Sequence, residues 1–169
     1  MTDSAAESTA WITAPDKYLA AHPPAYGPDR QTTSCYIGMR DGIRIALDVH
    51  LPADLPDGAR LPALAIFTPY YRRFKLKPAA PPGTEASPNA GYLRDFFTPH
   101  GYAVVVADVR GTGASFGVRD GFRSPAERED YREIADWIAG RPWCDGNIGS
   151  TGISYVGAAA DFLATTGHP

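Results

Sequence analysis

Two short apolar segments constrain the fold of this chain more than any other feature of its sequence. Residues 64–67 and 102–107 are continuous hydrophobic runs, a pattern typical of strands that are covered on both faces. Residues 92–97 read as a short helix, and strand, helix, strand with covered faces predicts a parallel sheet. The polar, proline-rich stretch at 72–89 is long for a connection in a compact domain, which indicates an active-site loop or a small excursion.

A β-hairpin is predicted ahead of these strands. Residues 35–39 and 43–51 are strand-like and flank a turn at Asp41 and Gly42, where glycine tolerates positive φ. The second run alternates strictly, so we expect one face of this strand to be buried. Its inward residues are Ile43, Ile45, Leu47 and Val49.

The strongest helix signal begins at Ser124. Ser124 can cap the helix, Pro125 suits its first turn, and Glu127 can close a capping box. Apolar residues then recur at i, i+3, i+4 and i+7, which places one stripe toward the sheet. The stripe consists of Tyr131, Ile134, Ala135 and Ile138, and Gly140 ends the helix.

Length and composition fit one globular domain. The 169 residues are 44% hydrophobic, which is enough to bury a core. Residues 1–33 contain several prolines and little periodicity, so they read as a loosely structured N-terminal arm. Ordered structure is predicted over residues 34–169, without internal repeats.

The charge pattern argues against nucleic acid and membrane partners. The net charge is −3 and the 16 basic residues are scattered singly or in pairs, so no basic stripe for nucleic acid or anionic lipid forms. The one local cluster, Arg72, Arg73, Lys75 and Lys77, is interpreted as a solvated loop. No apolar run reaches the roughly twenty residues of a membrane span. Residues 1–10 do not resemble a signal peptide, so a cytoplasmic protein is expected, although a fragment of a processed precursor would look the same.

The two cysteines do not indicate a disulfide or a metal site. Cys35 and Cys144 lie far apart and lack any paired spacing. Both are therefore expected to be small buried hydrophobic residues. No cofactor and no metal is predicted, and the oligomeric state is left open.

Residues 152–157, Gly-Ile-Ser-Tyr-Val-Gly, place a serine between a strand predicted at 148–153 and a helix of small residues predicted at 156–166. This order is typical of the nucleophile elbow, which exposes a serine hydroxyl at the top of a sheet. The second glycine stands one position later than in the general G-x-S-x-G pattern, so the pattern alone leaves a serine N-cap as an alternative. Because this serine follows the fifth strand-like segment of an alternating α/β order, we favour Ser154 as a nucleophile.

A serine nucleophile needs donors for the oxyanion that develops during acyl transfer. The backbone N–H of Tyr155, at the start of the helix, is placed to be one donor. The loop after the third strand, residues 68–71, has no glycine run, but Tyr70 carries a phenolic donor just past a proline. Tyr70 is the candidate for the second donor, with an aromatic ring packed under the loop as the alternative.

Five segments of the chain together carry a family resemblance. They are residues 39–42 (Met-Arg-Asp-Gly), 68–70 (Thr-Pro-Tyr), 108–117 (Asp-Val-Arg-Gly-Thr-Gly-Ala-Ser-Phe-Gly), 143–149 (Trp-Cys-Asp-Gly-Asn-Ile-Gly) and 152–157. In this order they resemble the cocaine esterase and X-prolyl dipeptidyl peptidase family of serine hydrolases, whose members favour Ser-Tyr-x-Gly at the elbow. The resemblance runs from about residue 34 to the end. It implies an α/β-hydrolase fold, with Ser154 as nucleophile and the Tyr70 hydroxyl and Tyr155 amide as the oxyanion hole.

The resemblance also implies that residues 34–169 are the N-terminal portion of an α/β-hydrolase catalytic domain, truncated after the nucleophile helix. In the family the sequence continues through a helical cap, a catalytic Asp, a catalytic His and a β-sandwich domain. His168 does not replace this base, because it lies about 20 Å from Ser154 along one predicted helix. The other histidines are interpreted as surface or structural: His22, His50 and His100. We therefore expect negligible turnover from this chain alone.

Two rival functions are left open. Residues 111–117 are glycine-rich and follow a buried strand, as in dinucleotide-binding oxidoreductases, but no helix is predicted to open at the glycines. The second rival is a non-catalytic or truncated hydrolase-like binding module.

Asp108 and Arg110, beside the glycines, are expected to pair and hold their loop in a structural role. Under the favoured hypothesis the partner is a small ester, amide or short peptide substrate, and the sequence does not distinguish among these.

Overall fold

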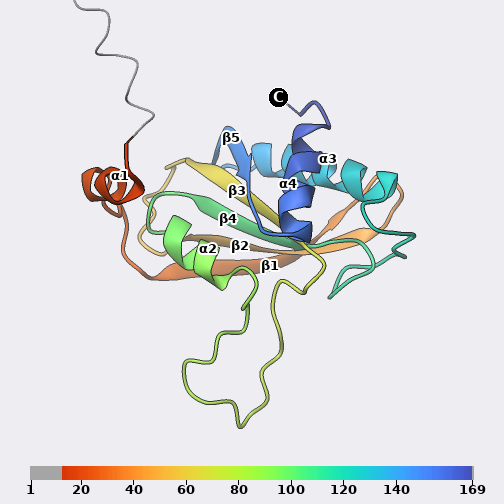
Figure 1. Cartoon of the computed structure of the whole chain (residues 1–169), viewed down its shortest axis with the longest axis horizontal. Helices are drawn as coiled ribbons and strands as arrows, with labels where there is room; N and C mark the ends of the chain where they lie inside the picture. Colours follow the sequence, from red (N-terminus) through yellow and green to blue (C-terminus); the bar gives the residue numbers. More distant parts are fainter. Residues whose placement is uncertain (1–12, 169) are drawn as a thin grey trace, which may run out of the picture.

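The computed structural model describes residues 13–168 as one mixed β-sheet with helices on both of its faces (Figure 1). The elements are, in chain order, α1 (Pro15–Ala21), β1 (Arg30–Gly38), β2 (Arg44–Pro52), β3 (Leu61–Thr68), α2 (Gly91–Phe97), β4 (Ala103–Asp108), α3 (Pro125–Ala139), β5 (Cys144–Ser150) and α4 (Tyr155–Ala164). The alternating α/β order predicted from the sequence is confirmed. The long connection between β3 and α2 extends away from the sheet as an open loop (Figure 1).

The sheet has the strand order β1-β2-β4-β3-β5. β1 and β2 form the predicted antiparallel hairpin, with Ile37 opposite Ile45, and Gly42 in its turn has a φ of 79°. β3 pairs in parallel with both β4 and β5, so the predicted parallel sheet is confirmed. The carboxyl ends of these three strands, and the loops that follow them, therefore share one edge of the sheet.

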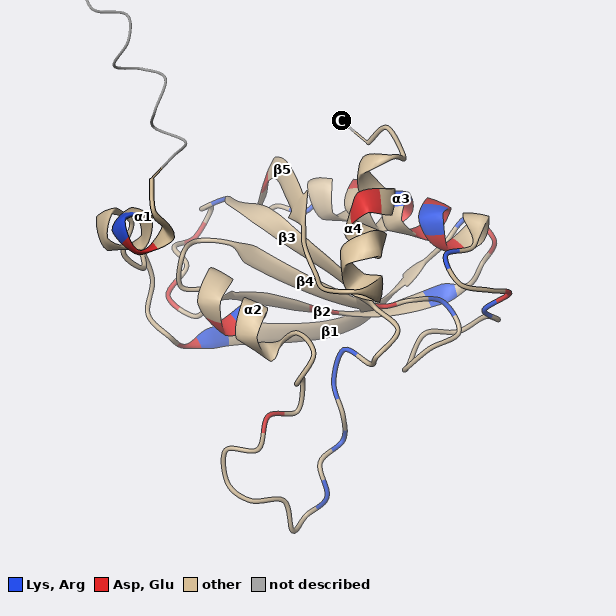
Figure 2. Cartoon of the chain, in the orientation of Figure 1, with Lys and Arg blue, Asp and Glu red and all other residues tan. Residues whose placement is uncertain are grey.

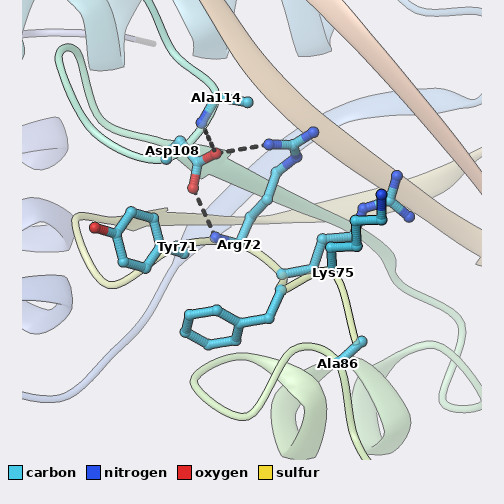
Figure 3. Close-up of a pocket in the computed structure, with 9 residues that line it drawn as sticks. Tyr71, Arg72, Lys75, Ala86, Asp108 and Ala114 are labelled. Atoms are coloured by element: carbon cyan, nitrogen blue, oxygen red, sulfur yellow. Dashed lines mark hydrogen bonds and ion pairs between the residues drawn. The ribbon is translucent and has the colours of Figure 1, made fainter. Parts of the chain in front are cut away.

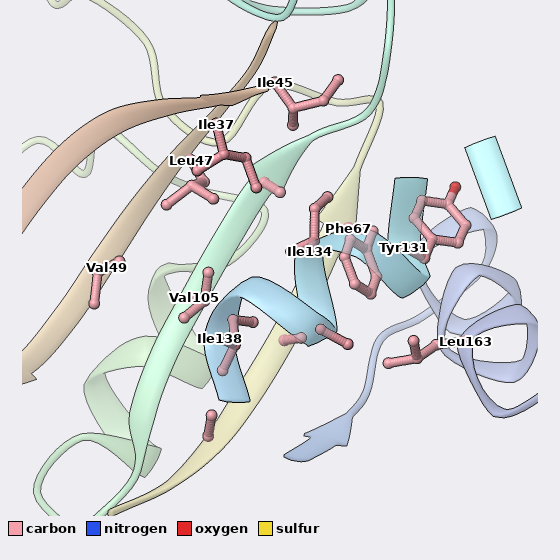
Figure 4. Packing of buried hydrophobic residues seen from close by; sticks show 14 of the residues in the cluster. Ile37, Ile45, Leu47, Val49, Phe67, Val105, Tyr131, Ile134, Ile138 and Leu163 are labelled. Atoms are coloured by element: carbon pink, nitrogen blue, oxygen red, sulfur yellow. The ribbon is translucent and has the colours of Figure 1, made fainter. Parts of the chain in front are cut away.

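Alternate residues of the central strands feed two hydrophobic clusters on opposite faces of the sheet. The larger cluster contains Phe67, the predicted apolar stripe of α3, and Leu163 of α4 (Figure 4). The smaller cluster contains Ile66, and Leu93 of α2 packs against it. Thus α3 and α4 cover one face, and α2 covers the other.

β2 is buried on both faces, beyond the single buried face that its alternation predicted. Ile45 is inaccessible as expected, but Asp48 and His50 on the other face are also buried, at 1% and 4% exposure. Hydrogen bonds make this burial tolerable: Ser34 donates to Asp48 at 2.6 Å, and Thr32 Oγ1 lies 2.9 Å from His50 Nδ1. A hydrophobic pattern reports only the apolar face, so it missed the covered polar one.

Regular structure begins before residue 34. α1 lies in the segment predicted to be a loose arm, and β1 starts at Arg30. The N–H groups of Ala25 and Tyr26 donate to Pro99 O at 2.9 and 3.0 Å, which fixes the segment after α1 to the turn before β4. Most of β1 is exposed, and this explains why its first residues lack a hydrophobic signature. Residues 1–12, the rest of the predicted arm, lie outside the described residues.

α3 begins with the predicted cap but without the predicted capping box. Ser124 Oγ accepts a hydrogen bond from Glu127 N at 3.2 Å, and Pro125 opens the helix. The Glu127 carboxylate turns away from the cap, is fully buried, and accepts a hydrogen bond from Arg119 at 3.0 Å. Donors in the core have therefore drawn this carboxylate away from the helix end.

The remaining expectations concern cysteines, charge and membrane spans. Cys144 is buried as predicted, Cys35 is only partly buried, and both thiols are free. Lys and Arg residues are spread over the elements, with a concentration on the loop between β3 and α2 (Figure 2). None of the helices within residues 13–168 has the length and apolarity that a bilayer crossing requires.

Candidate active site around Ser154

Ser154 occupies a sharp turn between β5 and α4. Its backbone angles are φ 59° and ψ −122°, a conformation that costs a non-glycine residue on the order of 1–3 kcal/mol. Its side chain is exposed and, within residues 13–168, makes no capping hydrogen bond to α4. The N-cap alternative therefore does not hold, and the turn connects the end of β5 to the start of α4 through a residue at positive φ.

The two glycines of the motif are required by close packing between this turn and α4. A Cβ on Gly152 would lie 2.6 Å from the carbonyl carbon of Val156, and a Cβ on Gly157 would lie 2.9 Å from Gly152 O. The first separation is far below the 3.5–4.0 Å of ordinary contacts between carbon atoms, and the second is too short for a Cβ beside a carbonyl oxygen. The late position of the second glycine is thus explained, because Gly157 is the residue of α4 that lies against the turn.

Tyr70 lies on the loop after β3, at the same edge of the sheet. Its backbone is held from two directions: Tyr70 N donates to Thr68 Oγ1 at 3.0 Å, and Asn89 Nδ2 donates to Tyr70 O at 2.7 Å. The ring stands edge-on to that of Tyr155, with 6.4 Å between centroids, and Tyr70 is 43% exposed. Such exposure disagrees with the alternative of a ring packed under the loop.

One cavity brings Tyr70 and Ser154 together. Its volume is about 280 Å³, and α2 and the end of the long loop form the wall that faces the Ser154 turn. The lining residues are all uncharged: Tyr70, Pro88, Asn89, Tyr92, Leu93, Gly152, Ile153, Ser154 and Val156. A neutral group is therefore what this cavity can accept without burying an unpaired charge.

Asp108, the last residue of β4, holds the loop that carries Tyr70 (Figure 3). Its carboxylate accepts hydrogen bonds from Arg72 N and from the Arg72 guanidinium, both at 2.6 Å, and from Ala114 N at 3.0 Å. Arg72 also donates to Asp48 at 3.0 Å, and its side chain is only 12% exposed. The interpretation of Arg72 as part of a solvated loop is wrong, because two buried carboxylates draw it inward.

The expected pair between Asp108 and Arg110 is also wrong. Arg110 instead donates to both carboxylate oxygens of Asp130 in α3, at 2.6 and 2.7 Å, and to Asp41 at 2.6 Å. Hydrogen bonds to Asp130 and Asp41 raise the pKa of Arg110, so the guanidinium stays charged. Asp108 thus braces the Tyr70 loop, whereas Arg110 ties the β1–β2 turn to α3.

The side chain of Tyr155 leads to a group that the sequence did not indicate as part of the site. Tyr155 is 2% exposed, and its hydroxyl donates to the buried carboxylate of Glu127. Its backbone N–H lies in the first turn of α4, where amide groups have no partner within the helix. The only sequence signal at Glu127 was its spacing from Ser124, which is equally typical of an exposed capping residue.

The four histidines of the chain are each engaged away from Ser154. His50 is buried in β2, and His22 Nδ1 and His100 Nδ1 lie 2.8 and 2.7 Å from the carbonyl oxygens of Tyr18 and Phe96. His168 Nε2 lies 3.2 Å from a carboxylate oxygen of Asp136 in α3. None of these histidines is among the residues that line the cavity beside Ser154.

The glycine-rich loop after β4 does not open into a helix. α3 begins only at Pro125, so no helix N-terminus meets the glycines, and the phosphate site of a dinucleotide fold is missing from this loop. Gly113 has a packing role instead, because a Cβ there would lie 2.3 Å from a carboxylate oxygen of Asp108. Within residues 13–168, no group of three or more His, Cys, Asp or Glu side chains is arranged to hold a metal ion.

Sequence comparisons connect this geometry to known proteins. The signature of the X-Pro dipeptidyl-peptidase (S15) family matches residues 41–169. A Mycobacterium bovis protein provisionally named a serine esterase is 41% identical over the whole of this chain, which covers 27% of that protein. The cocaine esterase of a Rhodococcus species is 34% identical over 78% of this chain and 20% of the esterase.

Solved structures agree with the sequence comparisons. A CocE/NonD family hydrolase from Staphylococcus aureus matches with a TM-score of 0.64 at 25% identity, over 83% of this chain and 26% of the hydrolase. An α-amino acid ester hydrolase matches with a TM-score of 0.64 at 26% identity, over 93% of this chain and 27% of that enzyme. The chain therefore spans about a quarter of the length of these relatives. It has the fold of the matching part of an α/β-hydrolase and belongs to the X-Pro dipeptidyl-peptidase (S15) family.

Proposed function

We propose that this chain carries the nucleophile of a serine hydrolase that cleaves small ester, amide or short peptide substrates. The observation that carries the proposal is the backbone of Ser154, held at φ 59° and ψ −122° with its side chain exposed. Such strain persists only where the surrounding structure enforces it. Membership of a family whose relatives include a cocaine esterase and a Lactobacillus helveticus Xaa-Pro dipeptidyl-peptidase supports the same reaction class.

In the proposed reaction the Ser154 oxygen attacks the substrate carbonyl carbon while its proton passes to an imidazole base. The carbonyl π electrons move onto oxygen and give a tetrahedral oxyanion. Collapse of this intermediate re-forms the carbonyl and expels the alcohol or amine, which takes the proton from the base. Water then attacks the acyl-serine ester in the same manner and restores the free hydroxyl.

Two donors are assigned to the oxyanion. One is the hydroxyl of Tyr70, whose side chain lines the same cavity as Ser154. The other is the backbone N–H of Tyr155 at the start of α4, where the helix dipole favours negative charge. Donors that are held in place before the reaction stabilise the transition state without reorganising during it, and the hydrogen bonds of Tyr70 to Thr68 and Asn89 supply that support.

We further assign the imidazole base to a residue outside this chain. The histidines at positions 22, 50, 100 and 168 are engaged elsewhere, and a serine hydroxyl without a base is a weak nucleophile. The 169-residue chain by itself is then expected to show negligible turnover. Saturable hydrolysis of a p-nitrophenyl ester by this purified chain, abolished by Ser154→Ala, would contradict that expectation.

The test uses the product of the complete reading frame, assayed with a p-nitrophenyl acyl ester and with an X-Pro-anilide. Ser154→Ala is expected to abolish hydrolysis of whichever substrate is cleaved. Tyr70→Phe is expected to lower kcat by about 10²–10³-fold, the usual effect of losing one oxyanion donor. Tyr71→Phe is the matched control, because Tyr71 is the next residue and is similarly exposed at 47%; it should change kcat less than twofold.

The same assay separates the proposal from a non-catalytic binding module. Hydrolysis that survives Ser154→Ala, or a complete product that cleaves neither substrate, would favour the module. Equal losses from Tyr70→Phe and Tyr71→Phe would contradict the assignment of Tyr70 alone, because both changes remove one hydroxyl from the same loop.

A further inference from the structure

Glu127 is a fully buried carboxylate that contacts three donors from three parts of the fold. It stands in the first turn of α3, and its exposed fraction is 0%. Tyr131, one turn later in α3, donates its hydroxyl to Oε2 at 3.1 Å, and Arg119 donates Nε to Oε1 at 3.0 Å. The third donor is the hydroxyl of Tyr155, which also reaches Oε2.

The contacts explain how a carboxylate can be held in this position. An ionised group in the core is costly unless it is paired and hydrogen-bonded, and here Arg119 supplies the opposite charge while the two phenols supply hydrogen bonds. Burial, together with the Glu127 charge, raises the pKa of Tyr155 and of Tyr131. Both phenols therefore remain protonated donors at neutral pH.

The ring of Tyr155 is enclosed by the same loop that supplies Arg119. The Arg119 guanidinium lies over the ring, 4.8 Å from its centroid, and Phe122 contacts the ring edge-on at 4.6 Å. α3, the loop before it and α4 thus meet at one side chain. That side chain belongs to the residue immediately after Ser154.

We propose that Glu127 is a positioning residue: by anchoring the Tyr155 hydroxyl, it aims the Tyr155 backbone N–H at the oxyanion and keeps Ser154 in its strained conformation. The inference rests on the proposed function, because it concerns one of the two assigned oxyanion donors. Glu127 itself does not touch the reacting atoms and acts only through Tyr155.

Glu127 acts on the direction of the Tyr155 N–H more than on the stability of the fold. The ψ angle of Ser154 and the φ angle of Tyr155 set where the Tyr155 N–H points, and a hydrogen bond weakens steeply when its angle at hydrogen falls toward 120°. A strained residue relaxes when the structure around it permits. Without the hydroxyl anchor, the first turn of α4 can rotate toward a less strained conformation, and the N–H turns away from the oxyanion.

The decisive pair of variants removes one hydroxyl each from the same carboxylate. Tyr155→Phe cuts the link between Glu127 and the residue after Ser154, whereas Tyr131→Phe cuts a link within α3 and leaves the elbow anchored. In the product of the complete reading frame, Tyr155→Phe is expected to lower kcat about tenfold with KM within twofold of the wild type, a fraction of the loss of a whole donor. Tyr131→Phe should leave kcat within twofold.

Each outcome bears on the inference. A kcat that is unchanged by Tyr155→Phe, or lowered equally by Tyr131→Phe, would overturn it, because the second result indicates general loosening of the core. If Glu127→Ala folds, it should lower kcat about tenfold, as Tyr155→Phe does. If Glu127→Ala does not fold, the kcat of Tyr155→Phe alone tests the inference. Ser154→Ala run in parallel separates the two claims: activity that survives it overturns the proposed function, whereas activity lost in Ser154→Ala but retained in Tyr155→Phe overturns only the role of Glu127.

Discussion

The two halves of the proposed oxyanion hole are built in different ways. The Tyr70 half offers a side-chain hydroxyl from an exposed residue on a loop. The Tyr155 half offers a backbone N–H from the first turn of α4, and its side chain is buried at 2% exposure. A side-chain donor can be deleted by one substitution, but a backbone donor can only be re-aimed. Activity should therefore fall when the Tyr70 hydroxyl is removed. On the Tyr155 side it should fall when the contacts that orient the backbone N–H are removed.

Each half is supported by a buried carboxylate, and the difference between these carboxylates follows the same division. Asp108, 1% exposed, accepts hydrogen bonds from two backbone N–H groups and one guanidinium, so it fixes the main chain of the Tyr70 loop. Glu127, 0% exposed, accepts only from side chains. Asp108 is expected to matter for stability and loop order, and Glu127 for the direction of one amide.

The largest expected effect comes from removing the support of the Tyr70 half. Asp108→Ala should lower the free energy of unfolding by about 4 kcal/mol, because it leaves two backbone N–H groups without an acceptor and removes one of the two carboxylates that pair with the largely buried Arg72. Urea unfolding of the 169-residue chain measures it. The control is Asp41→Ala: Asp41 also pairs with an arginine at 2.6 Å, but its side chain is 40% exposed, so its removal should lower the free energy of unfolding far less than Asp108→Ala does. Equal decreases in the free energy of unfolding for the two variants would contradict the role of Asp108 as a buried support of the Tyr70 loop.

A smaller effect should appear when the pH is lowered, and it arises in β2, the strand that supplies Asp48 to Arg72. Burial lowers the pKa of His50 to about 4 from an ordinary value of 6.5, and His50 lies two residues after Asp48, the second partner of Arg72. The unfolded chain therefore binds a proton below pH 6.5 that the folded chain refuses until about pH 4. The contribution of the neutral His50 to the free energy of unfolding is fully present above pH 6.5. It decreases by about 3 kcal/mol as the pH falls from 6.5 to about 4.

The variant His50→Asn isolates this contribution from the titration of carboxylates. Unfolding free energies of the wild type and the variant are compared at pH 7 and pH 4, and the wild type should lose about 3 kcal/mol more than the variant between these values. Parallel pH curves would mean that His50 is not held neutral in the fold. The cluster around Glu127 contains no histidine among its described contacts. The hydrogen bonds that orient Tyr155 should therefore not depend on a histidine that gains a proton in this pH range.

The smallest effect concerns the strain that each half stores. Ser154 and Tyr71 are non-glycine residues at φ 59° and 69°. At an ordinary position glycine is less stable than alanine by about 0.5–1 kcal/mol, but at a positive φ the order should reverse. Ser154→Gly should therefore exceed Ser154→Ala in stability by about 1 kcal/mol, as measured by thermal unfolding, and the same pair at Tyr71 reports on the other half. An alanine variant that is the more stable at Ser154 would remove the evidence for strain at the elbow.

The sequence predicts those elements whose burial imposes a periodic pattern. β3 and β4 are covered on both faces, so their runs are continuously apolar, and the stripe of α3 faces the sheet with helical spacing. Ser154 and Tyr70 could be placed near each other because the carboxyl ends of parallel strands share an edge. The hairpin could be placed because Asp41 and Gly42 suit a tight turn.

The polar contacts that support the site could not be predicted in the same way. Arg72 was expected to be solvated, but it pairs with Asp48. Arg110 was expected to pair with Asp108, but it pairs with Asp130. Glu127 was expected to bond to the cap of its own helix, but it accepts a hydrogen bond from Tyr155. These partners lie 24, 20 and 28 residues apart in sequence. Local spacing carries no information about contacts of this kind, because only the tertiary fold decides which donor reaches which carboxylate.

The central claim, that Ser154 is the nucleophile, is tested most directly by covalent labelling. The product of the complete reading frame is treated with a fluorophosphonate, digested, and mapped by mass spectrometry. We expect one adduct, on the peptide that contains Ser154, and no adduct in Ser154→Ala. An adduct on a different serine, or an unlabelled Ser154 in a preparation that hydrolyses esters, would contradict it.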